Sequence, residues 1–263
     1  MCIRDSGYGA AAIVTALVLP RFGWRAVFWV GLLPALITLW IRRRVPEPAM
    51  WQRSQRERDT DAARGPYFTG SLLAVTIAIT LMNAATMFAW WGLNLWIPAY
   101  LSLPTAQGGI GLSTVVMSGF VVAMQVGMWF GYVTYGVVSD RIGRKPTYIT
   151  YLILAAALVF LYGLSKTPMV LLALGPFVAF FGTGYFSGFG AITAELYPTA
   201  IRATAQGITY NIGRLASAAA PFVVGTLAQT RGFGAAFTMT SVAFLVAAAF
   251  WTLIPETRGR AMR

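Results

Sequence analysis

Residues 136–145 read Gly-Val-Val-Ser-Asp-Arg-Ile-Gly-Arg-Lys, and they join two long segments that carry no charge. No residue from 65 to 139 is charged, and residues 146–165 are again uncharged. Segments of this length and apolarity are typical of helices that cross a bilayer. We therefore predict a short charged turn between two transmembrane helices. In this turn Asp140 ends the first helix, Arg141, Arg144 and Lys145 crowd the connection, and Gly143 permits a sharp bend of the backbone.

The composition favours the lipid bilayer as the surroundings of this chain. Of its 263 residues, 57% are hydrophobic and 11% are charged, whereas about a quarter of the residues of a soluble domain are charged. The formal net charge is +12. The basic residues cluster in short loops between apolar segments, which is a topology signal and not the stripe of a phosphate-binding surface. We expect the bilayer as a partner, and no nucleic acid.

Cysteine and histidine are too scarce for most metal chemistry. The chain has one cysteine, Cys2, and no histidine, which excludes thiolate zinc sites and sites that need a histidine ligand or base. No pairing of a nucleophile with a base is visible. We expect no metal, no cofactor and no enzymatic activity.

Eight apolar segments divide the chain. Residues 1–6 lack the pattern of a signal peptide and are a candidate non-native leader. We interpret residues 7–41 as two helices, the first of them incomplete, residues 42–67 as an arginine-rich linker, 68–254 as six membrane helices, and 255–263 as a tail. When the eight segments alternate across a membrane, fourteen basic residues fall on one side and four on the other. Because positive loops stay in the cytoplasm, the linker and the C-terminus are expected there.

A repeat supports a division into halves of six helices. When the chain is shifted by 209 positions, Gly23 aligns with Gly232, Phe28 with Phe237, and the pair Pro46-Glu47 with Pro255-Glu256. Repeats of this kind are common in secondary transporters. Chance similarity between apolar helices is the alternative explanation.

Several motifs resemble those of the major facilitator superfamily. The pattern Gly-x-x-x-Asp-Arg-x-Gly-Arg-Lys at 136–145 is similar to the signature loop of these secondary transporters. The segment Glu195-Leu-Tyr-Pro-Thr-Ala-Ile-Arg202 resembles the Glu-x6-Arg motif of the sugar porters and the metabolite–proton symporters. Residues 45–48 and 255–259 look like the Pro-Glu motifs that follow the sixth and twelfth helices.

The resemblance implies an all-α, polytopic transmembrane bundle with the major facilitator fold, truncated at its N-terminus. It implies a symporter of the inner (plasma) membrane that moves a small metabolite by alternating access. Its partners would be the substrate, protons and the missing N-terminal half. The chain lacks the glutamine pair that sugar porters carry in the seventh helix of the family, which argues against a sugar substrate. We favour an organic anion and keep a sugar as the alternative.

Arg214 is the clearest candidate for a substrate-binding residue. It lies roughly 16 Å into its predicted span, near the membrane midplane. A cation at that depth needs a partner or a wet cavity, and no acidic residue lies inside a predicted span. Arg214 would bind an anionic substrate, or else it would bind helix carbonyls and hold two helices together.

Weaker candidates for the cavity share amide or aromatic side chains on predicted spans. Asn83, Trp90 and Asn94 recur at helical spacing, and interhelical contact is the alternative for them. The remaining candidates are Gln125, Tyr185, Tyr210 and Asn211. On the cytoplasmic side we expect a conformational gate formed by Asp140, Arg141, Gly143, Arg144, Glu195 and Arg202.

Two other functions are compatible with these residues. A drug or organic-cation exporter would share the fold, but Arg214 would repel a cationic substrate. A non-transporting membrane scaffold would share the hydrophobic segments, and the seven arginines of its linker would bind anionic lipid.

Overall fold

The computed structural model describes residues 18, 22–23, 25–44, 70–199 and 201–259 of the chain. The chain divides into two units, Met1–Gly65 and Pro66–Arg263. In the first unit, helix α2 (Leu32–Arg44) follows a turn at Gly31 and ends in three arginines. The expected leader, the first span and the linker from residue 45 onward lie outside the described residues.

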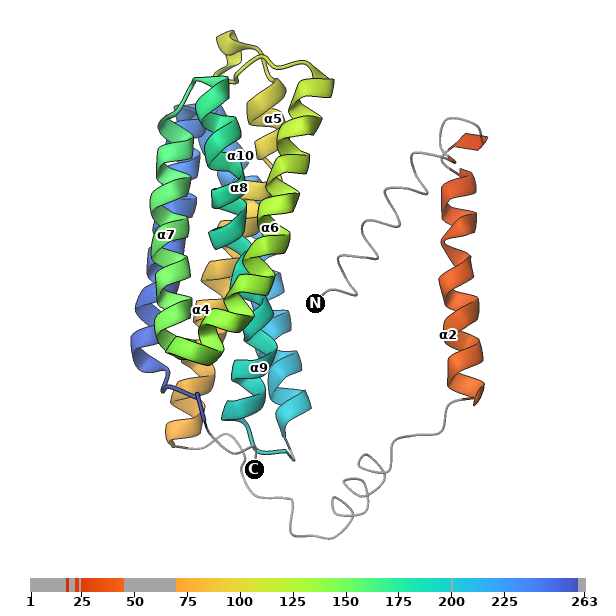
Figure 1. Cartoon of the computed structure of the whole chain (residues 1–263), viewed down its shortest axis with the longest axis vertical. Helices are drawn as coiled ribbons and strands as arrows, with labels where there is room; N and C mark the ends of the chain where they lie inside the picture. Colours follow the sequence, from red (N-terminus) through yellow and green to blue (C-terminus); the bar gives the residue numbers. More distant parts are fainter. Residues whose placement is uncertain (1–17, 19–21, 24, 45–69, 200, 260–263) are drawn as a thin grey trace. The chain divides into compact units, whose positions relative to one another are not determined.

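The second unit is a bundle of antiparallel helices (Figure 1). Its helices are α4 (Ser71–Asn94), α5 (Ile97–Ser102), α6 (Thr114–Ile142), α7 (Arg144–Leu164), α8 (Pro168–Gly184), α9 (Phe186–Leu196) and α10 (Arg202–Phe250), with short 3-10 turns at η2 (Thr105–Gln107) and η3 (Trp251–Leu253). Every described element is helical, so the all-α prediction is confirmed.

Two predicted spans are interrupted. The first of the six helices predicted in 68–254 breaks at Leu95 and Trp96, between α4 and α5, and Pro98 is the second residue of α5, where its missing N–H is tolerated. The membrane-length segment Pro168–Leu196 breaks at Tyr185, between α8 and α9.

Helix α10 contains the last two predicted spans. Its backbone is not helical at Gly232, where φ is +83°. The two limbs of α10 run in opposite directions on either side of this residue (Figure 1). The last two predicted helices are therefore separated by a break of one residue.

The predicted charged turn is shorter than the sequence suggested. Helix α6 continues past Asp140 to Ile142, and α7 begins at Arg144, so that Gly143 alone separates the two helices. Its φ of +129° is a conformation that residues other than glycine rarely adopt. Arg144 and Lys145 are the first two residues of α7, and not part of a loop.

Glycines allow α6 to lie directly against α8. A Cβ added at Gly127 would lie 2.1 Å from the carbonyl oxygen of Pro176, and one at Gly131 would lie 2.3 Å from that of Phe180. Small residues are the usual means of close helix contact in lipid. An added Cβ would lie 2.5 Å from Tyr151 Cε1 at Gly184 and 2.3 Å from Tyr135 Cε1 at Gly188, whereas at Gly190 nothing lies within 4 Å.

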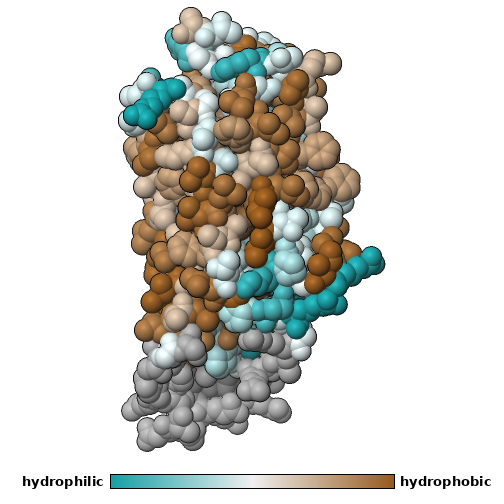
Figure 2. Space-filling model, turned by 90° about the vertical axis from the view of Figure 1, so that its left-hand side faces the viewer, coloured by the Kyte–Doolittle hydropathy of each residue, from teal (hydrophilic) through white to brown (hydrophobic). Residues whose placement is uncertain are grey.

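Six helical segments of the described chain are long and apolar enough to cross a membrane, and the longest of them, Arg202–Leu253, contains the break at Gly232. Figure 2 shows hydrophobic side chains over the middle of the visible face and hydrophilic ones toward its ends. This banding is the pattern of a membrane-spanning bundle.

Candidate functional site

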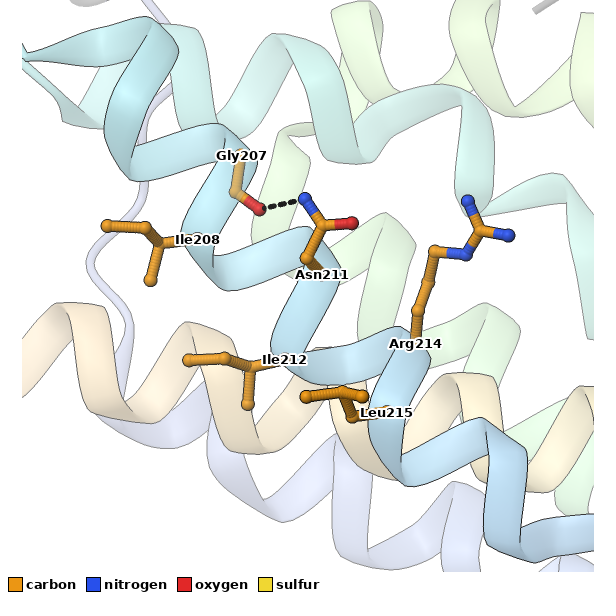
Figure 3. A pocket seen from close by; sticks show the side chains of 6 residues that line it. All are labelled: Gly207, Ile208, Asn211, Ile212, Arg214 and Leu215. Atoms are coloured by element: carbon orange, nitrogen blue, oxygen red, sulfur yellow. Dashed lines mark hydrogen bonds between the residues drawn. The ribbon is translucent and has the colours of Figure 1, made fainter.

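Arg214 lies on the exposed surface of the first limb of α10. It lines a shallow pocket together with Gly207, Ile208, Asn211, Ile212 and Leu215 (Figure 3). At 1.5 Å per residue, it stands about 18 Å along the helix from Arg202. Within the part of the chain that the structure describes, the Arg214 guanidinium has no hydrogen bond and no ion pair. Its five N–H donors are therefore available to a ligand.

The opposite face of α10 is held against α4. The side-chain Nδ2 of Asn83 donates to the carbonyl oxygen of Thr209 at 3.1 Å. At Gly213, an added Cβ would lie 2.2 Å from this same Nδ2, so the position has room for glycine and for no larger residue. The residue before Arg214 is thus a point of close approach between α10 and α4.

The pocket is formed by two parallel rows of residues on one helix face. Gly207, Asn211 and Arg214 form a polar row with the spacing i, i+4, i+7. The second row is apolar, has the same spacing one residue later, and consists of Ile208, Ile212 and Leu215. Because residues at this spacing stack along a helix, one face of α10 offers a polar edge beside an apolar edge.

The polar edge of α10 borders α9. The ring of Tyr210 packs on Phe189 with a centroid separation of 5.9 Å. The Nε2 of Gln206 donates to the carbonyl oxygen of Gly190 at 2.9 Å and to the Oγ1 of Thr193 at 2.8 Å. Tyr210 is half-buried by these contacts, so it supports the pocket wall beside Asn211 and Arg214.

The other predicted cavity residues occupy different surroundings. Asn83, Trp90 and Tyr185 are buried in the bundle, where Trp90 packs on Gly182 and the Tyr185 hydroxyl donates to the carbonyl oxygen of Thr86 at 3.5 Å. Asn94 is half-buried at the end of α4, and Gln125 is exposed on α6. The structure therefore brings Arg214, Asn211 and Tyr210 together, and it places the other five elsewhere in the bundle.

A charge network lies at the end of the bundle where α6, α7 and α9 meet. One guanidinium nitrogen of Arg144 donates to Asp140 and, at 2.8 Å, to the Oγ of Ser139. The other lies 3.2 Å from Glu195 Oε1. Glu195 accepts a second hydrogen bond, from the Thr257 hydroxyl at 2.5 Å. Side-chain exposure is 17% for Arg144 and 16% for Glu195, but 67% for Asp140.

One residue of the expected gate, Arg141, lies outside this network. Arg141 is exposed on α6 and forms no ion pair within residues 70–199 and 201–259. The Nε of Arg202 donates to the carbonyl oxygen of Tyr197 at 3.2 Å, so this guanidinium fastens the connection that precedes α10.

Sequence reasoning missed Glu256. Its carboxylate accepts from the backbone N–H groups of Arg144 and Lys145, both at 3.0 Å, and of Thr257 and Arg258, both at 2.9 Å. It therefore caps the N-terminus of α7 from a distant segment, where an anion is favoured. Burial opposes ionisation of this carboxyl, but the four N–H donors prevail and lower its pKa below the usual value.

Lys145, at the start of α7, also binds the segment that follows α10. The Nζ of Lys145 donates to the carbonyl oxygens of Thr252 at 3.1 Å and Ile254 at 2.9 Å. The motif that contains Glu256 was visible in the sequence, but the partners of Glu256 are more than a hundred residues away along the chain.

Among the described residues, no group of three His, Cys, Asp or Glu side chains could hold a metal ion.

Comparison with known proteins places this architecture in a family. A model of the Major Facilitator Superfamily matches residues 101–262. A Haemophilus influenzae protein whose name assigns it to metabolite transport is 32% identical over 97% of this chain and 64% of its own length. The cis,cis-muconate transport protein of Acinetobacter baylyi is 30% identical over 91% of this chain and 59% of its own length.

The fold agrees with this comparison. A crystal structure of the peptide transporter POT in complex with sulfate superposes with a TM-score of 0.59, at 16% identity, and covers 76% of this chain and 40% of that one. This chain spans about three fifths of the length of the two relatives named above. The matched family model covers the helices that carry the charge network and the Arg214 pocket, and on this ground the chain belongs to the major facilitator superfamily of multi-pass membrane proteins.

Proposed function

We propose that this chain is part of a secondary transporter that binds a small organic anion at Arg214. The observation that carries the proposal is the Arg214 guanidinium, which stands near the middle of a membrane helix with all its donors free among the described residues. A cation in such a position is costly without a partner. A carboxylate that accepts two N–H groups of one guanidinium would be a strong partner.

The related muconate transport protein supports an anionic substrate class, because muconate is a dicarboxylate at neutral pH. A cationic drug would meet the positive charge of Arg214 in the same pocket. Because an apolar row lies beside Arg214, we expect the substrate to carry a hydrocarbon body as well as its anionic group.

In this proposal the chain works with a first half of six helices, to which the unit Met1–Gly65 contributes the last part. Transport would proceed by alternating access, with the two halves moving around a site between them. In the outward-facing state, the Asp140–Arg144–Glu195 network would form contacts between the two halves at the cytoplasmic end of the bundle, in the inner membrane. Protons would drive uptake, and the proton-binding carboxylate would lie in the first half.

Uptake measured in proteoliposomes tests the Arg214 assignment. The protein expressed from its complete gene is compared with Arg214→Ala and Arg214→Lys, using a panel of labelled carboxylates. We expect Arg214→Ala to lower uptake at least tenfold. Arg214→Lys should recover part of it, because an ammonium keeps the charge but loses the planar fork.

The matched control is Arg231→Ala, which removes an exposed arginine from the turn of the same helix and should leave uptake unchanged. Carboxylate uptake that survives Arg214→Ala would reject the anion site. Competition by organic cations would instead favour the exporter, and the absence of any flux would favour the scaffold.

A further inference from the structure

The orientation of Asn211 restricts the kind of anion that the pocket can accept. The side-chain Nδ2 of Asn211 donates to the carbonyl oxygen of Gly207 at 2.7 Å, one turn earlier on the same helix (Figure 3). The amide nitrogen must face that carbonyl, since the reverse orientation would set two acceptor oxygens against each other. The Oδ1 of Asn211 is therefore presented on the exposed side of the helix.

Asn211 and Arg214 are neighbours of opposite hydrogen-bonding character. They lie three residues apart on the polar row, which corresponds to about 4.5 Å along the helix axis. Arg214 can only donate hydrogen bonds, whereas the Oδ1 of Asn211 can only accept them. Of the remaining pocket residues, Gly207 has no side chain and the row Ile208, Ile212, Leu215 is apolar.

We infer that, of two carboxylates with the same apolar body, the pocket prefers the one that also carries a hydroxyl or N–H group. The carboxylate would lie on Arg214, the donor on Asn211 Oδ1, and the hydrocarbon along the apolar row. The inference rests on the proposed function and narrows its substrate class.

The test uses matched probes that differ by one hydroxyl group. The protein from its complete gene is reconstituted, and the uptake of 3-phenylpropanoate is compared with that of its 2-hydroxy and 3-hydroxy derivatives. We expect at least one hydroxylated probe to have a kcat/KM about tenfold higher, which corresponds to one additional hydrogen bond. In Asn211→Leu, a variant of similar size without the acceptor, the ratio of kcat/KM between hydroxylated and parent probe should fall to within about twofold.

The outcomes separate the two proposals. If wild-type protein takes up all three probes in a manner that depends on Arg214 but without a preference, the Asn211 inference is overturned and the anion site stands. If uptake of every probe is insensitive to Arg214→Ala, the proposed function itself fails. If Asn211→Leu does not fold, the ratio of kcat/KM between the hydroxylated probes and 3-phenylpropanoate in the wild-type protein decides the inference.

Discussion

At the scale of single residues, Gly143 combines a left-handed backbone conformation with close neighbours. Its φ is +129°, and an added Cβ would lie 2.9 Å from Glu256 Oε2 and 3.2 Å from Pro146 Cγ. Strain of this kind costs about 1–3 kcal/mol. We expect Gly143→Ala to destabilise the protein by about that amount, measured by thermal unfolding in detergent.

The control for Gly143 is Gly190→Ala on α9, where nothing lies within 4 Å of an added Cβ. Alanine is the better helix former, so this variant should be neutral or slightly stabilising. Equal effects of the two variants would mean that the Gly143 turn is not strained.

The residue scale also marks what a sequence can reveal. Arg214 stood out because it is a charge inside an apolar segment, and the structure places it at a pocket that Asn211 also lines. Glu256 did not stand out. Its role depends on N–H groups at the start of α7, and helix spacing says nothing about which distant segment meets a helix end.

At the scale of elements, α7 depends on a carboxylate from the end of the chain. Glu256→Gln keeps the shape of the cap but removes its negative charge. The NH2 group of the glutamine would also face backbone N–H groups, which are donors like itself. Hydrogen bonds to a charged group contribute about 1.5–3 kcal/mol. We expect Glu256→Gln to lower the free energy of unfolding by about 1–2 kcal/mol at neutral pH.

The Glu256 cap should also depend on pH. Because the folded state lowers the pKa of this carboxyl, its contribution is present above the usual value of 4.5 and is lost as the pH falls below it. The difference in melting temperature between wild type and Glu256→Gln should therefore shrink between neutral pH and about pH 3. A difference that is constant over this interval would argue against a charged cap.

The helix breaks show which elements the sequence could foretell. The apolar composition of the spans was sufficient to predict helices, because it reports burial in lipid. It did not locate the breaks at Trp96 and Tyr185, since no charged residue marks either position. The break at Gly232 was predictable, because Arg231 and a glycine interrupt the hydrophobic pattern there.

At the scale of the whole molecule, the two ends of the bundle should face opposite sides of the membrane. The Asp140–Glu195 end and the 3-10 turn Thr105–Gln107 are separated by the full length of α6. In a Cys2→Ser background, we expect Ala203→Cys to react with an impermeant maleimide only from the cytoplasmic side. Ala106→Cys should react only from outside, and reaction of both from one side would contradict the topology.

The gate is a second property of the whole molecule. Asp140 is 67% exposed although it contacts Arg144, so its carboxylate is free to meet another surface. Exposed ion pairs contribute about 0–1 kcal/mol each, which is enough to change a balance between two states of similar free energy. We expect Asp140→Asn to shift the complete transporter toward the inward-facing state, measured as spin-label distances across the cytoplasmic end. Glu195→Gln, which alters a more buried pair, should lower the melting temperature as well.

The contact between Asn83 and α10 fixes the rotation of α10 about its own axis, and so fixes which residues face the pocket. Thr209 and Gly213 are one turn apart and both meet Asn83, so they fix which direction each later residue of the limb points. Each residue turns the chain by about 100°. A single residue inserted after Gly213 would therefore swing Arg214 from the polar row across to the side of the isoleucines, without changing its depth by more than about 1.5 Å. Binding at the site therefore depends on the direction in which α10 presents residue 214 as much as on the presence of arginine there.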